Sequence, residues 1–379
     1  MTRGTMTRGA VTPGTVIDIG IVGLGFISRQ YLDTLLSAES VRIAAVADLD
    51  ASRAQAAAAE IPGCRALTTG ELLADPGIGT VLNLTIPAAH AEVALAAIAH
   101  GKDVFGEKPL AATLADAQRM TDAAAAAGVR LGGAPDTVLG TGVQTARAAI
   151  DDGRIGRPVS ASAMWISAGH ESWHPHPDFY YREGGGPLLD MGPYYVTSLV
   201  QLLGPVTHVS GAGSRSRDER VIGSGPRAGE RVAVEVDTHL TGILHHASGA
   251  LSTVTMSFDG VQSTTAPIEV HGVEGSLIVP DPNYFEGEVR LHERGGSWET
   301  LEPSAGYVGS GRGIGLLDFV AGEGRASGAM ALHALEIMTA LAASAASGRR
   351  EALSTTVDRP SLVPLTPAAT WRGAVGASA

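Results

Sequence analysis

Lysine and cysteine are nearly absent from this chain of 379 residues. Lys102 and Lys108 are the only lysines among its 27 basic residues, and Cys64 is its single cysteine. A lone cysteine can form neither a disulfide within the chain nor a thiolate metal site, which fits a reducing cytoplasm. Because arginine serves wherever else a positive charge is used, each lysine raises the question of what it does that arginine cannot.

Long basic runs and long apolar runs are missing as well. The net charge is −12 and no cluster of Lys and Arg stands out, so a nucleic-acid partner is not expected. No apolar run approaches the ~20 residues that span a bilayer, so no membrane partner is expected either. Residues 1–14 repeat the letters MTRG without an apolar core, and we expect a disordered leader rather than a secretory signal. The sequence thus predicts a cytoplasmic protein.

The chain is too long for one ordinary hydrophobic core, and its residue pattern changes near residue 135, which divides it into two parts. In residues 15–134, short apolar runs alternate with Ala-rich helical stretches, which is typical of βαβ units around a parallel sheet. The expected strands are 16–22, 43–47, 80–84, 103–105 and 129–132, and the expected helices are 27–36, 51–61, 90–100 and 114–127. This pattern predicts a Rossmann dinucleotide-binding domain.

Residues 135–379 have a different pattern. After one expected helix, β-type runs follow one another without intervening helices, which indicates a large, mostly antiparallel open sheet. The expected strands are 159–166, 206–212, 232–244, 250–258, 267–271, 276–279 and 289–292; the expected helices are 141–152, 314–321 and 329–345. The Arg-, Gly- and Ser-rich region 214–230 is expected to be a mobile loop. The predicted fold class is therefore α/β, a Rossmann domain followed by an α+β domain for substrate binding and oligomerisation.

The stretch IGIVGLGFISRQYL places a Gly-x-Gly-x-x-Ser pattern, Gly23, Gly25 and Ser28, between the first expected strand and helix. Gly23 permits the tight turn, Gly25 lets the backbone approach a pyrophosphate, and Ser28 is small enough for close helix–strand packing. The anion would lie at the helix N-terminus, where free N–H groups favour it. Phe26 and Ile27 complete this expected cofactor loop. The pattern is weak alone, but its position after a buried strand strengthens it.

A carboxylate that could select the cofactor ends the second expected strand, VRIAAVADLD. Asp48 would accept hydrogen bonds from the adenosine ribose hydroxyls and repel a 2′-phosphate, which favours NAD over NADP. Arg53 could instead meet that phosphate, so NADP is kept as an alternative.

Two further loops follow strands of the expected parallel sheet, at the edge where such sheets bind ligands. The letters TIPAAH, with Thr85, Pro87 and His90, come after the third strand, and GEKPL, with Glu107 and Lys108, comes after the fourth. We expect these five residues to lie near the cofactor.

At these loops the sequence resembles the glucose–fructose oxidoreductase, inositol dehydrogenase and rhizopine-catabolism (Gfo/Idh/MocA) family, and the resemblance covers nearly the whole chain. It rests on GIVGLGFIS, VADLD, EKPLAATLADA, GRIGRP, GGGPLLDMGPYYV and HGVEGSLIVPDP, of which the EKP tripeptide is the most specific. It implies an N-terminal Rossmann domain and a C-terminal α/β domain. The open sheet of the second domain commonly makes oligomer contacts in this family, so a homodimer or homotetramer is expected.

The resemblance implies that Lys108 is the active-site lysine, that Glu107 supports the cofactor region, and that Pro109 is often held in a cis bond. The chemistry suits lysine, because an ammonium is a compact donor whose proton affinity depends on its surroundings, whereas a guanidinium stays charged and needs a planar partner. The alternative is that Lys108 forms only a surface ion pair with Glu107. We expect Lys102 to be a surface lysine of that kind.

The family pattern carries an Asp and, four residues later, a His, but GGGPLLDMGPYYVTSL carries Asp190 and then Tyr194. We hypothesise that Tyr194 exchanges a proton with the substrate oxygen, while Lys108 polarises that oxygen and, with the positive nicotinamide of NAD⁺, lowers the phenol pKa from ~10. Asp190 would orient a hydroxyl or the lysine. In a continuous helix Asp190 and Tyr194 share a face, but Pro193 in the first turn would leave Asp190 outside it. Tyr195 is expected to point elsewhere.

The segment SAGHESWHPHPDFYYREGGG is the expected substrate loop, because aromatic faces beside polar side chains suit the apolar C–H patches and hydroxyls of a sugar. His170, His174 and His176 are its candidate contacts, and His174 or His176 is the chief rival to Tyr194 as the acid/base group. No metal is expected, because prolines hold this stretch extended and family members generally need none. Asp136, which opens the second domain, is a further candidate for substrate contact.

Together these features predict an NAD(P)-dependent oxidoreductase that acts on a secondary alcohol or ketone of a sugar, cyclitol or glycoside, with NAD preferred. Two alternatives stay open. One is a lyase or glycoside hydrolase that uses tightly bound NAD for transient oxidation of its substrate, and the other is a non-catalytic dinucleotide sensor.

Overall fold

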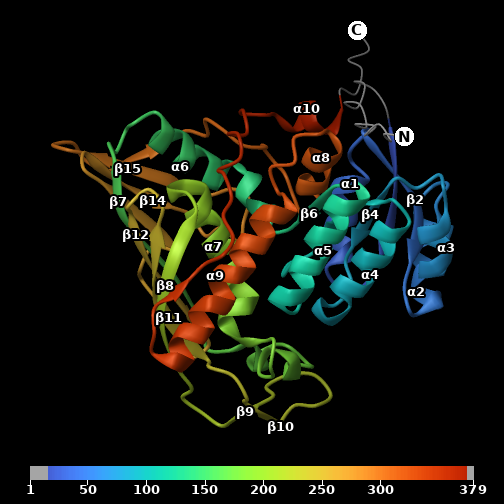
Figure 1. The fold of residues 1–379 in the computed structure, drawn as a ribbon, viewed down its shortest axis with the longest axis horizontal. Helices are drawn as coiled ribbons and strands as arrows, with labels where there is room; N and C mark the ends of the chain where they lie inside the picture. Colours follow the sequence, from blue (N-terminus) through green and yellow to red (C-terminus); the bar gives the residue numbers. More distant parts are fainter. Residues whose placement is uncertain (1–15, 374–379) are drawn as a thin grey trace, which may run out of the picture.

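The computed structural model describes residues 16–373, which form two large β-sheets with helices between and around them (Figure 1). The six-stranded sheet is built by the first third of the chain and the nine-stranded sheet by the remainder. The expected leader, residues 1–14, lies outside the described residues. The predicted α/β class, with a Rossmann sheet followed by a large, mostly antiparallel sheet, is confirmed.

The six-stranded sheet has the order β3-β2-β1-β4-β5-β6, and its paired strands are all parallel. Its strands are β1 (Ile17–Val22), β2 (Val41–Ala47), β3 (Arg65–Ala66), β4 (Thr80–Asn83), β5 (Asp103–Gly106) and β6 (Leu131–Gly133). The helices between them are α1 (Ser28–Leu35), α2 (Ala51–Glu60), α3 (Thr69–Ala74), α4 (Pro87–Ala99) and α5 (Leu114–Ala127). Because strand order reverses between β1 and β4, the carboxyl ends of these strands frame the crevice where such sheets bind ligands.

Most elements of this half were predicted to within three residues, because its strands are short apolar runs buried on both faces. Two elements were missed. β3 is only two residues long and exposed, and α3 is six residues long, so neither is long enough to show a period. The N-terminus of α3 nevertheless carries a recognisable capping box between Thr68 and Glu71.

The nine-stranded sheet has the order β16-β15-β14-β13-β7-β12-β11-β8-β17. The pairing of β7 with β12 is parallel and the other pairings are antiparallel. Its strands are β7 (Pro158–Ile166), β8 (Val206–Ser214), β11 (His239–His246), β12 (Leu251–Ser257), β13 (Ile268–Gly272), β14 (Gly275–Val279), β15 (Val289–Glu293), β16 (Glu299–Leu301) and β17 (Glu351–Ala352). The alternation of buried and exposed residues, as in β11 and β12, leaves one face of the sheet open.

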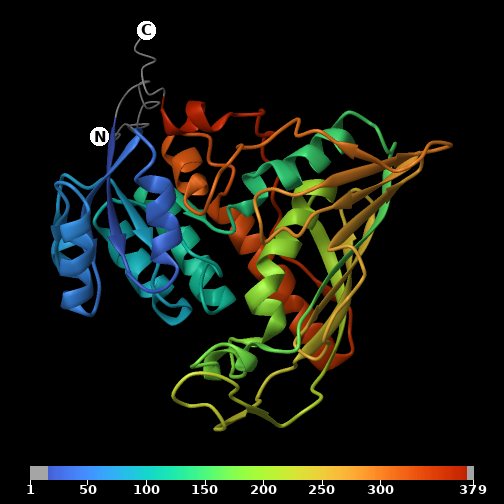
Figure 2. The same ribbon diagram turned by 180° about the vertical axis from the view of Figure 1, so that it is seen from behind.

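Two expectations for residues 214–244 were wrong. The expected strand 232–244 is interrupted: β10 (Arg231–Ala233) ends before Val234, and β11 begins five residues later. The expected loop 214–230 contains β9 (Glu219–Val221), which pairs with β10 in a separate two-stranded sheet. This β9–β10 hairpin projects beyond the large sheet in both views (Figures 1 and 2).

Two long helices lie between the two sheets (Figure 1). α7 (Gly186–Leu203) packs on β7 and β12, and α9 (Gly328–Ser347) packs on β8 and α7 and reaches α5 and β6 of the Rossmann domain. Among the described residues, α9 is the one helix long and apolar enough to cross a membrane, which corrects the expectation that no such run exists. Most of its surface is buried inside the protein, as expected of a core helix that is apolar all round. The remaining described elements are η1 (Thr137–Leu139), α6 (Thr141–Asp151), η2 (His170–Ser172), η3 (Asp178–Tyr180), α8 (Ile314–Val320) and α10 (Ala368–Arg372).

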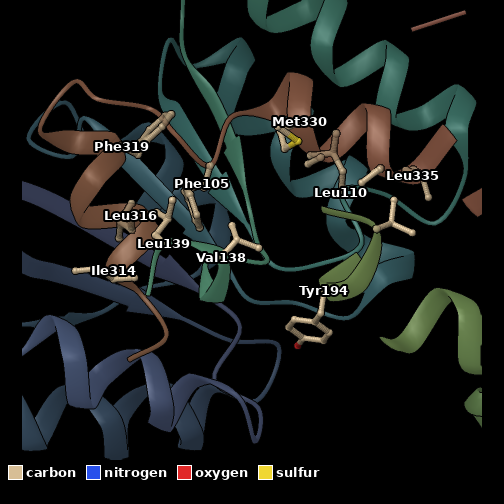
Figure 3. Packing of buried hydrophobic residues seen from close by; sticks show 14 of the residues in the cluster. Phe105, Leu110, Val138, Leu139, Tyr194, Ile314, Leu316, Phe319, Met330 and Leu335 are labelled. Carbon is tan, nitrogen blue, oxygen red and sulfur yellow. The ribbon is translucent and has the colours of Figure 1, made fainter. Parts of the chain in front are cut away.

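The late helices return the chain to the Rossmann domain and join the two parts through one continuous apolar core (Figure 3). The ring of Phe319 in α8 meets Phe105 of β5 edge-on, with 5.8 Å between ring centres. A Cβ added at Gly132 of β6 would lie 2.7 Å and 2.9 Å from these two rings, so only glycine permits this contact. Tyr194 of α7 lies at the border of the same core.

Candidate active site

A cleft of about 680 Å³ lies between the two domains. One wall comes from the loops that follow β1, β4 and β5, and the other from α7 and the segment 173–185. Of the residues predicted to bind cofactor or substrate, those that line the cleft are Phe26, Ile27, Thr85, Pro87, Glu107, Lys108, His174, Asp190 and Tyr194. The carboxyl edge of the Rossmann sheet and the start of α7 therefore face each other across one site.

Lys108 extends from the end of β5 to α7. Its Nζ atom donates to the backbone oxygen of Asp190 at 2.7 Å and to Oδ1 of the same residue at 3.1 Å. It also lies 5.2 Å from the ring centre of Tyr194. Burial lowers the pKa of Lys108, but its attraction to Tyr194, Asp190 and Glu107 outweighs this, and the pKa lies above its ordinary value. The group is thus an ammonium at neutral pH, and it is not the surface lysine of the alternative interpretation.

Asp190 lies inside α7 rather than outside it, which corrects the expectation based on Pro193. The helix begins at Gly186, with Pro187 in its first turn, and continues through Pro193. Asp190 and Tyr194 are therefore one turn apart on the same face, and both point toward Lys108.

His170 is the histidine that joins this group. Its Nε2 atom lies 2.8 Å from Oδ2 of Asp190, while Lys108 holds the other carboxylate oxygen. Burial alone would raise the pKa of Asp190, but Lys108 and His170 outweigh it and lower the pKa to about 2. The carboxylate is thus a permanent anion between two donors. The ring of His170 is itself buried, and its Nδ1 atom has no hydrogen-bond partner.

Tyr194 is 4% exposed, and this burial acts on its pKa against the predicted lowering by Lys108. Burial raises the pKa of Tyr194, and the opposing effects of Lys108 and Arg312 do not overcome it. At neutral pH the side chain is therefore a phenol able to donate a proton. The spacing of residues along the chain does not reveal how closely α9, α6 and the large sheet would pack on α7.

Arg312 is a residue that the sequence analysis missed. Its guanidinium carbon lies 5.4 Å from the ring centre of Tyr194. It donates to Gln30 of α1 and to Asn283 at 3.0 Å each, so it connects the two domains beside the cleft. Its position in the chain, in the letters GSGRGIG between β16 and α8, offered no signal that it would reach this site.

Glu107 is tied to its neighbours through both carboxylate oxygens. Oε1 accepts from the Tyr31 hydroxyl of α1 at 2.7 Å, and Oε2 accepts from the backbone N–H of Lys108 at 2.8 Å. The carboxylate therefore fixes the loop after β5 against α1. This arrangement is consistent with a supporting role beside the cofactor rather than with an ion pair to the Lys108 ammonium.

His90 connects the loops after β4 and β5. It is 2% exposed, and its two ring nitrogens lie 2.7 Å from the Pro109 oxygen and 2.9 Å from the Thr85 oxygen. It holds the shape of both loops and does not line the cleft. Pro87 is the first residue of α4 and lines the cleft beside Thr85.

The loop after β1 has the shape that a dinucleotide requires. Gly23 has a φ of +96°, and an added Cβ would lie 2.7 Å from the Leu84 carbonyl, so no other residue fits there. A Cβ added at Gly25 would meet nothing within 4 Å, which leaves open space where a pyrophosphate approaches the backbone. Phe26 and Ile86 are 93% and 70% exposed and line the cleft with apolar surface. The loop therefore fits NAD.

These two glycines give a matched pair of variants. We expect Gly25→Ala to leave the free energy of unfolding within about 0.5 kcal/mol of the parent while weakening NADH binding about tenfold or more, because the methyl group occupies the pyrophosphate space. Gly23→Ala is expected to lower the free energy of unfolding by about 2–3 kcal/mol through strain. Urea unfolding and titration of NADH fluorescence measure the two effects. Unchanged NADH affinity in a folded Gly25→Ala protein would contradict the placement of the cofactor.

Asp48 follows β2 and reaches back to the same loop. Its Oδ2 atom accepts from the Leu24 N–H at 2.7 Å, and its Oδ1 atom accepts from the Asp50 N–H at 2.8 Å. Arg53 lies 3.1 Å from Oδ1, with its side chain about half exposed. Asp48, the carboxylate predicted to favour NAD, and Arg53, the cation that could meet a 2′-phosphate, therefore form an ion pair with each other. Ser28 closes the loop by donating to the Gly25 oxygen at 2.7 Å.

Several predicted contacts lie away from the cleft. Asp136 is fully buried and accepts from the N–H groups of Gly313 and Gly315, and burial raises its pKa to about 6. It supports the start of α8 and does not line the cleft. His176 is exposed, and its N–H donates to Nδ1 of His174.

Lys102 and Tyr195 both lie outside the cleft lining. Lys102 is 6% exposed and donates to the Asp75 and Ile78 carbonyls, so the expected surface position was wrong. Tyr195 points away from the cleft, as expected, and its hydroxyl bonds Asp281 at 3.1 Å.

The segment that carries His170 is held from behind by the β9–β10 hairpin (Figure 2). Arg220 of β9 is almost fully buried and donates to Glu171 at 3.0 Å, and it also pairs with Asp259. The Gly223 N–H bonds the Glu171 carbonyl at 2.7 Å, and the Tyr181 hydroxyl donates to the Glu171 carboxylate. The hairpin therefore fixes one wall of the cleft rather than forming the expected mobile loop.

The chain is similar in sequence to known oxidoreductases in both of its parts. Residues 17–133 match the family model described as an oxidoreductase family with an NAD-binding Rossmann fold, and residues 143–278 match the GFO/IDH/MocA C-terminal domain. A 1,5-anhydro-D-fructose reductase of Ensifer adhaerens is 30% identical over 66% of this chain and 72% of its own length. A myo-inositol 2-dehydrogenase of Thermotoga maritima is 30% identical over 55% and 58%.

Solved structures of similar fold superpose on a longer part of this chain than these two relatives match in sequence. An NAD binding oxidoreductase from Klebsiella pneumoniae superposes with a TM-score of 0.79 and 25% identity, over 89% of this chain and 99% of that one. A levoglucosan dehydrogenase in complex with NADH and levoglucosan has a TM-score of 0.75 and 21% identity, over 90% and 100%, and supports the fold alone.

Proposed function

Because this chain belongs to the Gfo/Idh/MocA oxidoreductase family, we propose that it transfers a hydride between NAD and a secondary alcohol or ketone of a sugar, cyclitol or glycoside. One observation carries the proposal. In the cleft beside the cofactor loop, the Nζ atom of Lys108 bonds Asp190 and lies 5.2 Å from the ring centre of Tyr194. Relatives named for anhydrofructose, inositol and levoglucosan support a carbohydrate-like substrate.

When bound, NAD supplies the nicotinamide ring that accepts or releases the hydride. The protein must then manage the charge and the proton on the substrate oxygen. Lys108 donates a hydrogen bond to that oxygen and stabilises the negative charge that develops there. Asp190, anchored by His170, holds the ammonium in place and keeps it charged. Glu107 and His90 are positioning residues, because each fixes the loops that carry the lysine.

Tyr194 takes the place of the usual histidine and exchanges the proton in this proposal. In the direction of ketone reduction, the buried phenol donates its proton to the substrate oxygen, and this is the form that dominates at neutral pH. In the direction of alcohol oxidation the phenolate must accept the proton, so the fraction of active enzyme grows as the pH rises. The protein thus belongs, in our proposal, to a branch of the family with a tyrosine acid/base group.

We propose that Asp48 selects NAD, and that NADP is used less well. The change Asp48→Asn removes the negative charge but keeps an oxygen for the Leu24 N–H, and it frees Arg53 to meet a 2′-phosphate. The ratio of kcat/KM for NADP to that for NAD is expected to rise about tenfold or more, the effect of about 1.4 kcal/mol of removed repulsion. Steady-state kinetics with both cofactors measure this ratio. An unchanged ratio would remove Asp48 from the selectivity site.

The domain boundary and the oligomer are part of the same proposal. We place the boundary near residue 134, after β6, although α8 and α9 return to the first domain. The open face of the nine-stranded sheet presents Val159, Ile243 and Leu251, which are 43%, 41% and 46% exposed. We propose that this face joins copies of the chain into a homodimer or homotetramer.

The function is tested by a panel of sugars, cyclitols and glycosides, each with NAD and with NADP, followed at the absorbance band of the reduced nicotinamide. Stoichiometric NADH formation with at least one compound is expected. Conversion of a glycoside without net NADH would instead favour a lyase or hydrolase that oxidises its substrate transiently. A protein that binds NADH but converts nothing would be a dinucleotide sensor, and the proposal would be wrong.

A further inference from the structure

The substrate side of the cleft is an aromatic wall that begins at the reacting groups and runs outward. The ring of His170, which contacts Asp190, lies 4.5 Å from the ring of Tyr180 and 5.1 Å from that of Trp173. Beyond them, Phe179 lies 4.0 Å from Tyr180 and 5.5 Å from His174. We define the aromatic wall as Trp173, His174, Phe179 and Tyr180, all of which line the cleft.

This wall leaves apolar surface open where a ligand could cover it. Trp173 is 58% exposed and Phe179 is 56% exposed, and neither is needed to fill the core. Large exposed aromatic rings in a concave site are typical of ligand contacts, because their burial is favourable and their rigid rings lose little entropy. The proximity to His170 and Asp190 means that one ligand can reach both the reacting groups and the wall.

The charged side chains that line the cleft already have partners within the protein. Among the described residues that line it, Lys108 is the one lysine or arginine, and its ammonium is paired with Asp190. Glu107 uses both oxygens within the protein. Arg182 and Arg227, on neighbouring segments, are each paired with Asp178 at 4.0 Å and 2.6 Å. A phosphate or carboxylate on the substrate would therefore find no free cation in the lining. Arg312 lies beside Tyr194 but outside this lining, where its Nη1 atom is buried and its Nε and Nη2 atoms donate to Gln30 and Asn283.

The wall is held in place before a ligand binds. Arg220, Gly223 and Glu235 of the hairpin region bond the segment 168–181 from behind, at its backbone or at Glu171. Gly225 packs so closely that an added Cβ would lie 2.7 Å from the Cβ of Pro175. Such preorganisation lowers the entropic cost of binding on this surface.

We propose that the aromatic wall is a subsite for the aglycone of a neutral glycoside: the sugar ring lies at Lys108 and Tyr194, and an apolar, preferably aromatic, substituent covers Trp173 and Phe179. This inference rests on the proposed oxidoreductase function for the position of the sugar. It narrows the substrate class from sugars in general to uncharged glycosides with an apolar aglycone, and it excludes sugar phosphates and nucleotide sugars as preferred substrates.

The test uses matched phenyl and methyl β-glycosides of glucose, galactose, xylose and N-acetylglucosamine, together with glucose 6-phosphate. For each sugar that is oxidised, the phenyl glycoside is expected to have a kcat/KM about tenfold or more above that of the methyl glycoside. Trp173→Ala and Phe179→Ala should each reduce this ratio toward 1, chiefly by lowering kcat/KM for the phenyl glycoside. Trp298→Ala, a change at a 38% exposed tryptophan outside the cleft lining, should leave the ratio unchanged.

A direct measurement of glycoside binding distinguishes a failure of this inference from a failure of the proposed function. Calorimetry of the NADH-loaded protein should detect each phenyl glycoside more tightly than its methyl partner, and Trp173→Ala should abolish the difference. If no compound yields NADH but this binding pattern is present, the proposed function fails and the subsite stands. Equal binding and equal kcat/KM of the two glycosides, or a preference for glucose 6-phosphate, would overturn the subsite while leaving the oxidoreductase function intact.

Discussion

Replacement of Lys108 by alanine is expected to lower kcat/KM by about 10³-fold or more, because the substrate oxygen loses its charged donor and Asp190 loses its partner. Lys108→Arg should also lose at least about 10²-fold, since the planar guanidinium cannot occupy the short space between Asp190 and the substrate. NADH affinity, measured by fluorescence, should change only a few-fold. The loss then belongs to the chemical step rather than to cofactor binding.

The other lysine provides a matched control. Lys102 donates to two backbone carbonyls near α3 and lies outside the cleft. Lys102→Met should lower the melting temperature but leave the kcat of the folded enzyme within about twofold, in keeping with a structural contact. If Lys108→Ala retained a tenth or more of the parent activity, or if both lysine variants lost activity equally, Lys108 would not be the polarising group.

Replacement of Tyr194 by phenylalanine is expected to lower kcat for alcohol oxidation by about 10²- to 10³-fold near neutral pH. The pH dependence is more informative than the rate alone. Burial raises the pKa of Tyr194, and oxidation requires the deprotonated form, so the parent rate should climb with pH into the alkaline range. Reduction requires the protonated form and should decline over the same range. Both slopes should be lost in Tyr194→Phe.

Three variants separate Tyr194 from its rivals. Tyr195→Phe removes the hydroxyl that bonds Asp281 and should cost about 1 kcal/mol of stability with no effect on the pH profile. His174→Gln and His170→Asn test the loop histidines. Tyr194 would be displaced from its role if one of these histidine variants flattened the pH profile and Tyr194→Phe did not.

The parts of the site that the sequence could indicate are those joined by short stretches of chain. The glycine loop, Asp48 and the EKP loop each follow a buried strand, and parallel pairing brings the ends of such strands to one edge. The four-residue spacing of Asp190 and Tyr194 likewise fixes a shared face once the helix is continuous. For these residues, the local sequence pattern and the known topology of a parallel sheet are enough to predict that they lie in one site.

The remainder depends on contacts between distant segments. His170 contacts Asp190 from η2, a separate segment of the chain, whereas its neighbours His174 and His176 had an equally strong signal in the sequence. Arg312 arrives at Tyr194 from the far end of the chain. The direction of the Tyr194 pKa follows from its burial in the folded protein, where α7 packs against α9, α6 and the large sheet, and no spacing in the sequence reveals this. Asp136 was misplaced for the same reason, since its partners Gly313 and Gly315 are far away in sequence.

The central claim is that Lys108 and Tyr194 together hold the oxygen of the carbon that exchanges the hydride. A crystal structure of the protein with NAD and a bound substrate tests it most directly. We predict that Lys108 Nζ and the Tyr194 hydroxyl both lie within about 3.2 Å of one substrate oxygen, whose carbon faces the nicotinamide. A substrate oxygen bonded instead to a loop histidine, with the Tyr194 hydroxyl out of reach, would contradict the account.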